Sequence, residues 1–528
     1  GGSTWTTNTT NKSDRITRLT YIPTRAPGLT LWDGAICLYL ALPTLVFCTW
    51  FRPAVAALLV AAVVCGLIFS LKQVQWTRGE LPSRTVGWLA LLSIAWVSLG
   101  GAGHFFYANF DWLTRDAILR DLAHTGWPPS YPTTEAHPLI LRAPLGYFLP
   151  AAVVGALAGL HAADMMLFAW TSLGFFLLLA AAMPLFTTTK QRVVCLLVLL
   201  LFSGMDLAGY ALVRGAIPVP GEHLEWWAGF AQYSANTTLL AWVPNHALPA
   251  WLTTIVIIRH WRQRELAMVA PVFGACVPLW SPLAALGTVP FFLAGIDWRR
   301  DLPQLLRARV FLPLALVALV SARYLTIGSQ HIPGGWLLAL ASREDVVLNL
   351  YLLLCLLEFG LLCMVLARLR AFGLQVAIAA ALLCVLPLYR FGYGNDIVMR
   401  ASIPALLVLA IASAKALVSP GPRIWRGTLA TLLAIGALGA LQEPIRALLG
   451  QRWQPTGLSL VEVSERLTGG RGEAAMPTTY VSHLDQPDLA WMLRDPSQVT
   501  RAEAATAAST AGDGTKPTRR ANGDAADQ

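Results

Sequence analysis

Long hydrophobic runs separated by short polar stretches dominate this chain. A helix needs about 20 apolar residues to cross the hydrocarbon core of a bilayer, and runs of about that length recur from residue 33 onward. They cover residues 33–51, 53–72, 85–103, 163–187, 191–213, 238–258, 310–328, 346–367, 371–389, 401–419 and 425–443. The pattern predicts an all-α fold, a polytopic transmembrane helical bundle.

Two further apolar stretches do not fit a single span. Residues 266–296 are too long for one helix and are interrupted by Pro278, Ser281 and Pro282, so we expect two short spans that meet at a bend. Residues 138–160 contain Arg142 and three prolines. We expect this second stretch to be interfacial, re-entrant or a tight pair of segments.

The composition supports a membrane protein and excludes other classes. Hydrophobic residues make up 56% of the 528 residues and charged residues 13%, with a mean hydropathy of +0.56. The net charge of +10 does not indicate nucleic-acid binding, because most Arg and Lys residues lie in short loops between apolar runs. The eight cysteines lie in or beside apolar stretches without a CxxC motif, so we interpret them as packing residues.

The basic clusters also predict the sidedness of the loops. If the clusters near residues 72–84, 190–192, 259–264, 299–309, 368–370 and 423–426 are cytoplasmic, the polar loops between the other span ends lie outside. The outer segments are then 104–137, 214–237, 329–345, 390–400 and the tail after 443, with about 13 spans in total. This topology predicts one extracytoplasmic site built from loops that are far apart in the sequence.

The same pattern predicts a domain organisation. We expect a cytoplasmic N-terminal segment at residues 1–30, a transmembrane domain at 31–443, a small extracytoplasmic C-terminal segment at 444–500 and a disordered tail at 501–528.

The first outer loop has the densest set of chemically reactive side chains. Asp111 follows a run of aromatic residues and precedes Trp112, which places a carboxylate at headgroup depth where it could act as a base. Asp111 with Arg115, and Asp116 with Arg120, are spaced as i,i+4 pairs on an amphipathic helix that we expect to lie on the membrane. The alternative for Asp116, Arg120 and Asp121 is a solvated ladder of charges. Further along, an aromatic and proline-rich stretch leads to His137 and Arg142, and it either shapes a sugar or lipid pocket or only ties a helix to the surface.

The later outer segments supply candidate binding residues. Glu225 is either a site residue or a polar residue facing headgroups, and Asn245 and His246 interrupt an apolar helix, where they serve either the site or helix packing. Asn395, Asp396 and Arg400 begin a span, either as a helix cap with a helix-dipole partner or as part of a phosphate clamp. Arg323, near an outer span end, is a second candidate phosphate partner. The histidine spacing predicts no metal site, and a divalent cation could bind only through scattered carboxylates.

With these residues assembled, the chain resembles the GT-C superfamily of polytopic glycosyltransferases, which use polyprenyl-phosphate-linked sugars. The resemblance is architectural and covers roughly residues 30–443. The stretch FDWLTRD places Asp111, with Asp116 next, where that superfamily has its catalytic acidic residue, and His137, Pro138 and Leu139 are similar to a degenerate HPPL-like stretch. The usual paired acidic motif is absent. GMDLAGY and GNDIVMRASIPAL also resemble stretches of an uncharacterised family of bacterial membrane proteins.

The resemblance implies an integral membrane glycosyltransferase of the bacterial inner membrane with an extracytoplasmic active site. It would transfer a sugar, with inversion, from a polyprenyl-phosphate donor to a glycan or lipid-linked acceptor. Asp111 would be the general base, Arg400 with Arg115 or Arg323 would stabilise the leaving phosphate, and Arg142 and His246 would bind donor or acceptor. One alternative is a polysaccharide polymerase or ligase that uses undecaprenyl-diphosphate-linked repeats. An alternative of another class is a lipid-linked sugar transporter or flippase.

Overall fold

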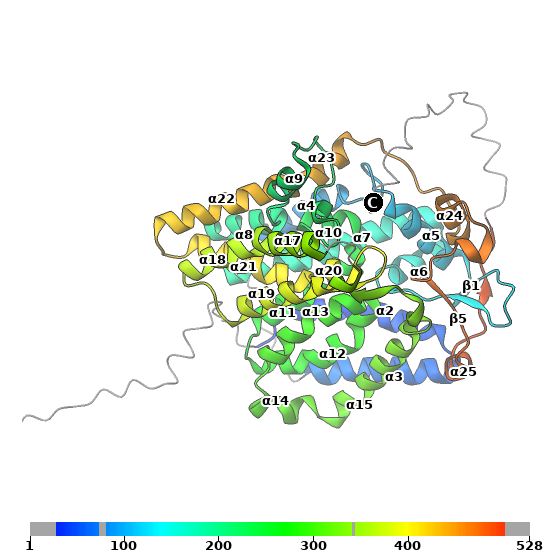
Figure 1. The fold of residues 1–528 in the computed structure, drawn as a ribbon. Coiled ribbons are helices and arrows are strands. Elements are labelled where there is room, and N and C mark those ends of the chain that lie inside the picture. Colours follow the sequence, from blue (N-terminus) through cyan, green and yellow to red (C-terminus); the bar gives the residue numbers. More distant parts are fainter. Residues whose placement is uncertain (1–27, 73–80, 341–343, 502–528) are drawn as a thin grey trace, which may run out of the picture.

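A computed structural model describes residues 28–72, 81–340 and 344–501 (Figure 1). Helices dominate these residues, as the apolar pattern predicts. The expected N-terminal segment falls outside the described residues except for its last three positions. The tail expected to be disordered also falls outside them, apart from Arg501.

Among the described residues, eight continuous helical stretches are long and apolar enough to cross a membrane. This finding supports a membrane protein, while the total of about 13 spans stays a prediction. The eight stretches contain the following elements: α2 (Leu31–Phe47) with η1 (Cys48–Trp50), α3 (Pro53–Lys72), α7 (Leu160–Ala182) with η2 (Met183–Leu185), α8 (Thr189–Leu201) with α9 (Asp206–Arg214), α15 (Ala308–Leu325), α17 (Glu344–Cys355) with η5 (Leu356–Gly360) and α18 (Leu361–Arg368), α20 (Asp396–Ala401) with α21 (Ile403–Val418), and α22 (Arg423–Ala440) with α23 (Gln442–Leu449).

The remaining elements are shorter. The helices are α4 (Ser83–Ser98), α5 (Asp111–His124), α6 (Leu149–Ala158), α10 (Asn236–Trp242), α11 (Pro244–Arg259), α12 (Arg264–Trp280), α13 (Pro282–Gly295), α14 (Trp298–Leu305), α16 (Leu337–Leu340), α19 (Leu374–Val385), α24 (Leu460–Thr468) and α25 (Pro487–Met492). Single helical turns are η3 (Glu225–Ala228), η4 (Ser329–His331), η6 (Leu386–Leu388) and η7 (Gly472–Ala475).

The two ambiguous stretches are interrupted as the sequence predicts, while their placement in the membrane stays a prediction. Ser281 is extended between α12 and α13, and its hydroxyl accepts a hydrogen bond from Ala284 N (3.2 Å), so the chain breaks at the expected bend. In residues 138–160 the longest helix is α6, whose ten residues are too few to cross a bilayer. Gly159, with a φ of 88°, lets α7 start immediately after α6.

Burial separates inner helices from outer ones. Every residue of α11 is buried, and α21 is buried from Ile403 to Ala416. In contrast, α3 and α15 expose large apolar side chains such as Leu58, Ile68 and Leu319. Exposed apolar surface of this kind is expected where helices face lipid.

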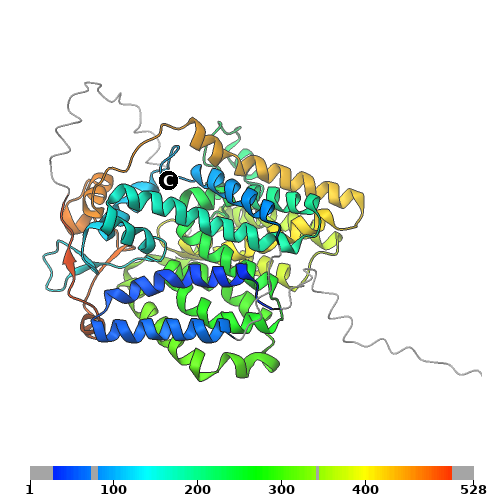
Figure 2. The same ribbon diagram turned by 180° about the vertical axis from the view of Figure 1, so that it is seen from behind.

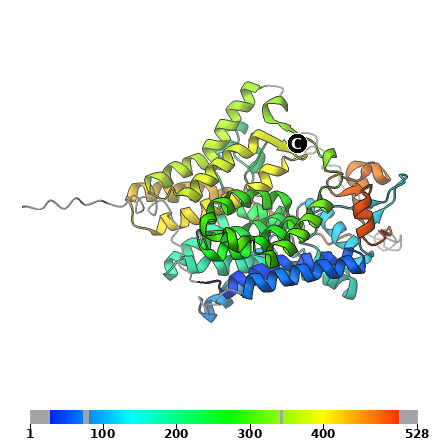
Figure 3. The same ribbon diagram turned by 90° about the horizontal axis from the view of Figure 1, so that it is seen from below.

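A small four-stranded sheet joins the first outer loop to the C-terminal segment. Its order is β5 (Val481–His483), β2 (Leu139–Leu141), β1 (Pro129–Tyr131) and β6 (Ser497–Gln498). Figures 1 and 2 show the orange and red C-terminal segment beside the cyan first-loop segment, and Figure 3 places it at one end of the bundle. The sequence analysis missed this pairing. The C-terminal segment therefore packs directly against the first loop, while the side of the membrane on which both lie stays a prediction.

A second pair of strands joins two other outer segments. Strand β3 (Gly334–Trp336) pairs antiparallel with β4 (Tyr389–Phe391). It brings the segment after α15 next to the segment that leads into α20.

Candidate functional site

The first outer loop is anchored inside the protein. The Trp112 indole N–H and the Asn109 amide both donate hydrogen bonds to the Ala241 carbonyl, each at 2.9 Å. Gly101, with a φ of 92°, leaves room for the indole, because a Cβ there would lie 2.3 Å from Trp112 Nε1. Trp112 is therefore fully buried, and most of α5 is buried with it. The expectation that α5 lies on the membrane as an amphipathic helix is wrong.

Asp111 opens α5 and forms the predicted i,i+4 pair with Arg115. Arg115 Nη2 donates to Asp111 Oδ2 at 3.3 Å, and the Asp111 side chain keeps 36% of its surface exposed. Arg115 is buried, and its Nε and Nη1 atoms have no hydrogen-bond partner among the residues that the structure describes. Buried guanidinium donors normally find acceptors. This position therefore has spare donors beside an accessible carboxylate.

A second arginine–aspartate pair starts at α20. Arg400 pairs with Asp396, as their spacing predicts, and Arg400 Nε is buried without a hydrogen-bond partner. Gly392, with a φ of 82°, is needed because a Cβ there would lie 1.9 Å from Asp396 Oδ2. Asn395 stands at the N-cap position, but its side chain donates to the Phe230 carbonyl (2.9 Å) and caps no helix N–H, so the predicted side-chain cap is wrong.

Tyr480, in the C-terminal segment, lies within electrostatic range of both pairs. Burial raises the pKa of its hydroxyl, and the charges of Arg115, Asp111, Arg400 and Asp396 also act on this pKa.

His246 lies next to this group and has structural contacts of its own. Its Nδ1 lies 2.7 Å from Ser281 Oγ, and its Nε2 lies 3.1 Å from the Asn245 side-chain amide. Both Arg400 and Arg115 are within electrostatic range of the ring. Asn245 and His246 therefore join α11 to the start of α13 behind the two arginines, as the helix-packing alternative predicts.

Asp116, the second candidate base, is enclosed. Its carboxylate lies 3.1 Å from His104 Nε2, and the fully buried His104 ring packs edge-on against Trp453 at 4.6 Å between centroids. Burial raises the pKa of the Asp116 carboxyl to about 6, against the opposing hydrogen bond from His104. The predicted pair of Asp116 with Arg120 is wrong, because Arg120 binds Asp121 and the Thr500 carbonyl instead.

The alternative of a solvated charge ladder is also wrong. Asp121 is fully buried and accepts hydrogen bonds from Leu460 N (3.0 Å) and the Tyr131 hydroxyl (3.1 Å). These contacts attach α24 to α5. The charges on this face of α5 are structural ties between the loop and the C-terminal segment.

Three other predicted binding residues contact the C-terminal segment. Arg323 pairs with Asp488 at 2.9 Å and also binds Gln486. His137 is exposed, and its carbonyl lies 3.2 Å from His483 Nδ1. Arg142 donates from Nη2 to the Thr478 carbonyl (2.8 Å) and from its backbone N–H to the Tyr480 carbonyl (2.7 Å). Within the part of the chain that the structure describes, none of these three side chains forms a hydrogen bond or ion pair with Asp111 or Arg400.

Glu225 belongs to a separate cluster of buried carboxyl groups. It accepts hydrogen bonds from Ala235 N (2.8 Å) and the Thr238 hydroxyl (2.5 Å), and its charge acts on Asp206 and Glu358. Asp206 and Glu358 lie within hydrogen-bonding range of each other, and Trp227 Nε1 donates to Glu358 at 3.0 Å. Asp206 Oδ1 and Glu358 Oε2 receive no hydrogen bond from any of the described residues. Glu358 lies in the π-helical turn η5, a feature frequent at functional sites.

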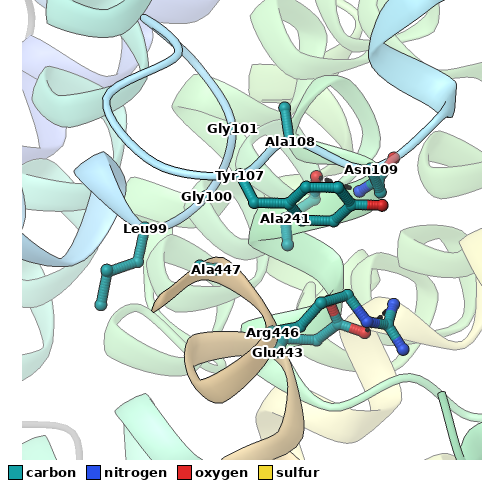
Figure 4. Close-up of a pocket in the computed structure, with 10 residues that line it drawn as sticks. All are labelled: Leu99, Gly100, Gly101, Tyr107, Ala108, Asn109, Ala241, Glu443, Arg446 and Ala447. Carbon is teal, nitrogen blue, oxygen red and sulfur yellow. Dashed lines mark hydrogen bonds and ion pairs between the residues drawn. The ribbon is translucent and has the colours of Figure 1, made fainter. Parts of the chain in front are cut away.

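A cavity near the first loop is too small for a lipid headgroup. It lies between Tyr107 and Asn109 on one side and Glu443 and Arg446 on the other (Figure 4). Its volume of about 10 Å³ suits roughly one water molecule. Among the described residues, no group of three or more His, Cys, Asp or Glu side chains could hold a metal ion.

The sequence analysis missed Tyr480, His104 and Trp453 as neighbours of the site. His104 has a positive φ of 50°, which turns its ring back towards Asp116, and no residue pattern predicts that turn. Trp453 donates to the Ala108 carbonyl at 2.8 Å from a part of the chain remote in sequence. Only the pairing of β2 with β5 brings Tyr480 to the first loop, and three-residue strands give no clear pattern.

Comparison of the chain with protein-family models, with curated proteins and with solved structures finds no match.

Proposed function

We propose that the protein is a membrane glycosyltransferase that transfers a sugar from a polyprenyl-phosphate donor to an extracytoplasmic glycan or lipid-linked acceptor. The observation that carries the proposal is the pair of arginines with unused donors, Arg115 and Arg400, beside the accessible carboxylate of Asp111. Guanidinium groups bind phosphate oxygens well, because their planar array of donors matches phosphate geometry. Their carboxylate partners leave the N–H groups of Arg115 Nε and Nη1 and of Arg400 Nε able to donate hydrogen bonds to a further ligand.

In the proposed mechanism, Asp111 removes a proton from the acceptor hydroxyl. The acceptor oxygen attacks the anomeric carbon, the bond from that carbon to the phosphate oxygen breaks, and polyprenyl phosphate leaves with the bonding electrons. Arg115 and Arg400 stabilise the charge that develops on the phosphate. Attack opposite the leaving group inverts the anomeric configuration. Asp111 is favoured over Asp116 because Asp116 is enclosed by His104 and Trp453.

The test is a transfer assay with the purified protein in lipid nanodiscs. The donors are a panel of undecaprenyl-phosphate-linked sugars, and the acceptor is a cell-envelope lipid extract. We expect Asp111→Asn to lower the rate by at least about 100-fold, as loss of a general base does. Asp495→Asn, which changes a fully exposed carboxylate of the C-terminal segment, should keep the wild-type rate. Full activity of Asp111→Asn would refute the assignment of the base.

The buried carboxyl cluster favours a second candidate, a transporter or flippase for lipid-linked sugars. Ionisable groups in membrane-spanning segments often serve transport, and Asp206 and Glu358 lie in two of the candidate spans. Reconstituted vesicles separate the two functions. Movement of the lipid-linked sugar across the bilayer without a transfer product would support the transporter, whereas product formation without flux would support the transferase.

A further inference from the structure

Helix α14 lies at the end of α15 that is farther from the C-terminal segment (Figure 1). It directly precedes α15, whose other end carries Arg323, paired with Asp488 of α25 at 2.9 Å. The 18 residues of α15 rise about 27 Å, close to the roughly 30 Å thickness of the hydrocarbon core of a bilayer. Because α15 is one of the stretches able to cross a membrane, α14 should lie at the headgroups of the face opposite the C-terminal segment.

One side of α14 exposes a row of large apolar side chains. Trp298, Leu302 and Leu306 follow one another at intervals of four residues, and each has 43–54% of its surface exposed. The Trp298 indole N–H donates to the Leu293 carbonyl at 2.8 Å, which holds the ring at the end of α13. Helix α13 exposes Leu286 and Leu293 in turn. Since tryptophan is enriched where acyl chains meet headgroups, this row fits that boundary better than it fits water.

Arg300 fixes α14 against the start of α12. Its Nε and Nη2 atoms donate to the two carboxylate oxygens of the fully buried Asp301, each at 2.7 Å. Nη2 also donates to the Arg262 carbonyl at 3.1 Å, just before α12 begins. These bonds hold the position of the apolar row relative to the neighbouring helices.

The other arginines at this end of the bundle add positive charge beside the apolar row. Residues 262–265 and 297–309 contain six arginines but only three acidic residues, one of which, Asp301, is paired with Arg300. Three of these arginines are exposed and form no hydrogen bond or ion pair with any described residue: Arg264, Arg299 and Arg309. Exposed guanidinium groups next to an apolar row are typical of surfaces that bind acidic lipids.

We propose that α14, with the starts of α12 and α15, binds anionic phospholipids at the membrane face opposite the proposed transfer site. The free guanidinium groups of Arg264, Arg299 and Arg309 hold the headgroup phosphates, because their planar donors match phosphate oxygens. The row from Trp298 to Leu306 contacts the upper part of the acyl chains. This surface uses neither the ligand nor the residues of the transfer site, so it stands or falls separately from the proposed function.

The first test measures equilibrium binding of fluorescent phosphatidylglycerol and phosphatidylcholine to the full chain in neutral detergent. The wild type should bind the anionic lipid at least about tenfold more tightly. Each arginine near an anionic lipid contributes about fivefold, so Arg299→Gln combined with Arg309→Gln should weaken phosphatidylglycerol binding about 25-fold. Thermal unfolding curves that match the wild type would show that the loss does not come from misfolding.

Arg370→Gln combined with Arg423→Gln is the matched control. It removes the same charge from exposed arginines of another basic cluster, so it should leave most of the binding intact. Equal losses for the two double variants would overturn the proposal, because net charge and not this surface would then attract the lipid. Equal affinity of the wild type for the two lipids would overturn it as well.

A second test locates α14 relative to the bilayer in nanodiscs. The difference in tryptophan emission between the wild type and Trp298→Phe isolates the signal of Trp298 from that of the other tryptophans. Phosphatidylglycerol brominated near the headgroup end of its acyl chains should quench this difference signal. A difference signal that the brominated lipid leaves unquenched would place α14 away from the bilayer and overturn the proposal.

Discussion

The molecule has two polar clusters with opposite deficits. Around Arg115 and Arg400, guanidinium N–H groups lack acceptors, whereas around Asp206 and Glu358, carboxyl oxygens lack donors. A buried group without a partner costs free energy, so each deficit indicates what the cluster should take up. The first needs an anion. The second needs a proton, because two adjacent carboxyl groups cannot both ionise cheaply in a buried setting.

The largest effect should come from removing a donor at the first cluster. Arg400→Ala should weaken undecaprenyl phosphate binding by about 2–3 kcal/mol, or roughly 30- to 150-fold, because hydrogen bonds to charged groups are the strong ones. Equilibrium binding to the protein in nanodiscs measures this change. Arg390→Ala is the matched control, since Arg390 lies in the same outer segment but binds only the Tyr393 carbonyl. Equal losses for both variants would mean that general positive charge, and not this site, attracts the lipid.

The carboxyl cluster should show a smaller effect that depends on the substituted group. Glu358→Gln should change the free energy of unfolding by less than about 1 kcal/mol. The glutamine amide can donate the hydrogen bond that a proton shared by Asp206 and Glu358 is expected to provide. Glu358→Ala should cost about 2–4 kcal/mol, since it leaves a cavity and removes the acceptor of Trp227 Nε1. Thermal unfolding in detergent measures both variants.

An infrared difference spectrum detects the proton that Asp206 and Glu358 are expected to share. The wild type should show the carbonyl band of a protonated carboxyl group at neutral pH, and Glu358→Gln should lack it. If the glutamine variant is instead as unstable as the alanine variant, the cluster requires a negative charge and the contrast with the arginine cluster fails.

The smallest effect should lie at the edge of the sheet that joins the C-terminal segment to the first outer loop. His483 Nε2 lies 2.6 Å from Glu473, whose other oxygen accepts a hydrogen bond from Thr133 at 2.6 Å. The bond from Thr133 lowers the pKa of Glu473, and despite desolvation the His137 carbonyl and Glu473 raise the pKa of His483. Because the pKa of Glu473 is lowered in the folded state, its ionised carboxylate stabilises the fold above pH 4.5, the unfolded pKa. This stabilisation is lost as the pH falls through the folded pKa. Because the pKa of His483 is raised in the folded state, its protonated ring stabilises the fold below pH 6.5, the unfolded pKa. This stabilisation is lost as the pH rises through the folded pKa.

Docking of the C-terminal segment should therefore be tightest between about pH 4.5 and 6.5. Both side chains are about one-third exposed, so solvent screening limits the effect to less than about 1 kcal/mol. Limited proteolysis across this pH range measures it, and Glu473→Gln should flatten the profile. A wild-type profile that is already flat would show that this ion pair does not hold the segment.

The sequence predicted the parts of the site that depend on local helix geometry. Asp111 with Arg115 and Asp396 with Arg400 are confirmed as pairs, because residues four apart on a helix are neighbours in any context. The break at Ser281 was also predictable, since two flanking prolines interrupt the helical hydrogen bonds. The basic clusters also predicted that the segments containing α5 and α20 lie on the same side of the membrane, and this stays a prediction.

The positions of the other candidate site residues depend on long-range packing, which the sequence pattern does not reveal. Asp116 and Arg323 look like site residues in the sequence, yet one is enclosed by His104 and Trp453 and the other is paired with Asp488. Their partners lie 12 and 165 residues away in the chain, where helix periodicity carries no information. Tyr480 was missed for the same reason, because its place depends on a sheet of two- and three-residue strands.

The central claim is that Arg115 and Arg400 together bind a lipid phosphate beside Asp111. An experimental structure of the protein in nanodiscs with undecaprenyl phosphate tests it most directly. The account predicts phosphate density within hydrogen-bonding distance of both guanidinium groups, with the Asp111 carboxylate facing the headgroup. Phosphate density bound elsewhere, with the donors of Arg115 and Arg400 still unoccupied, would contradict it.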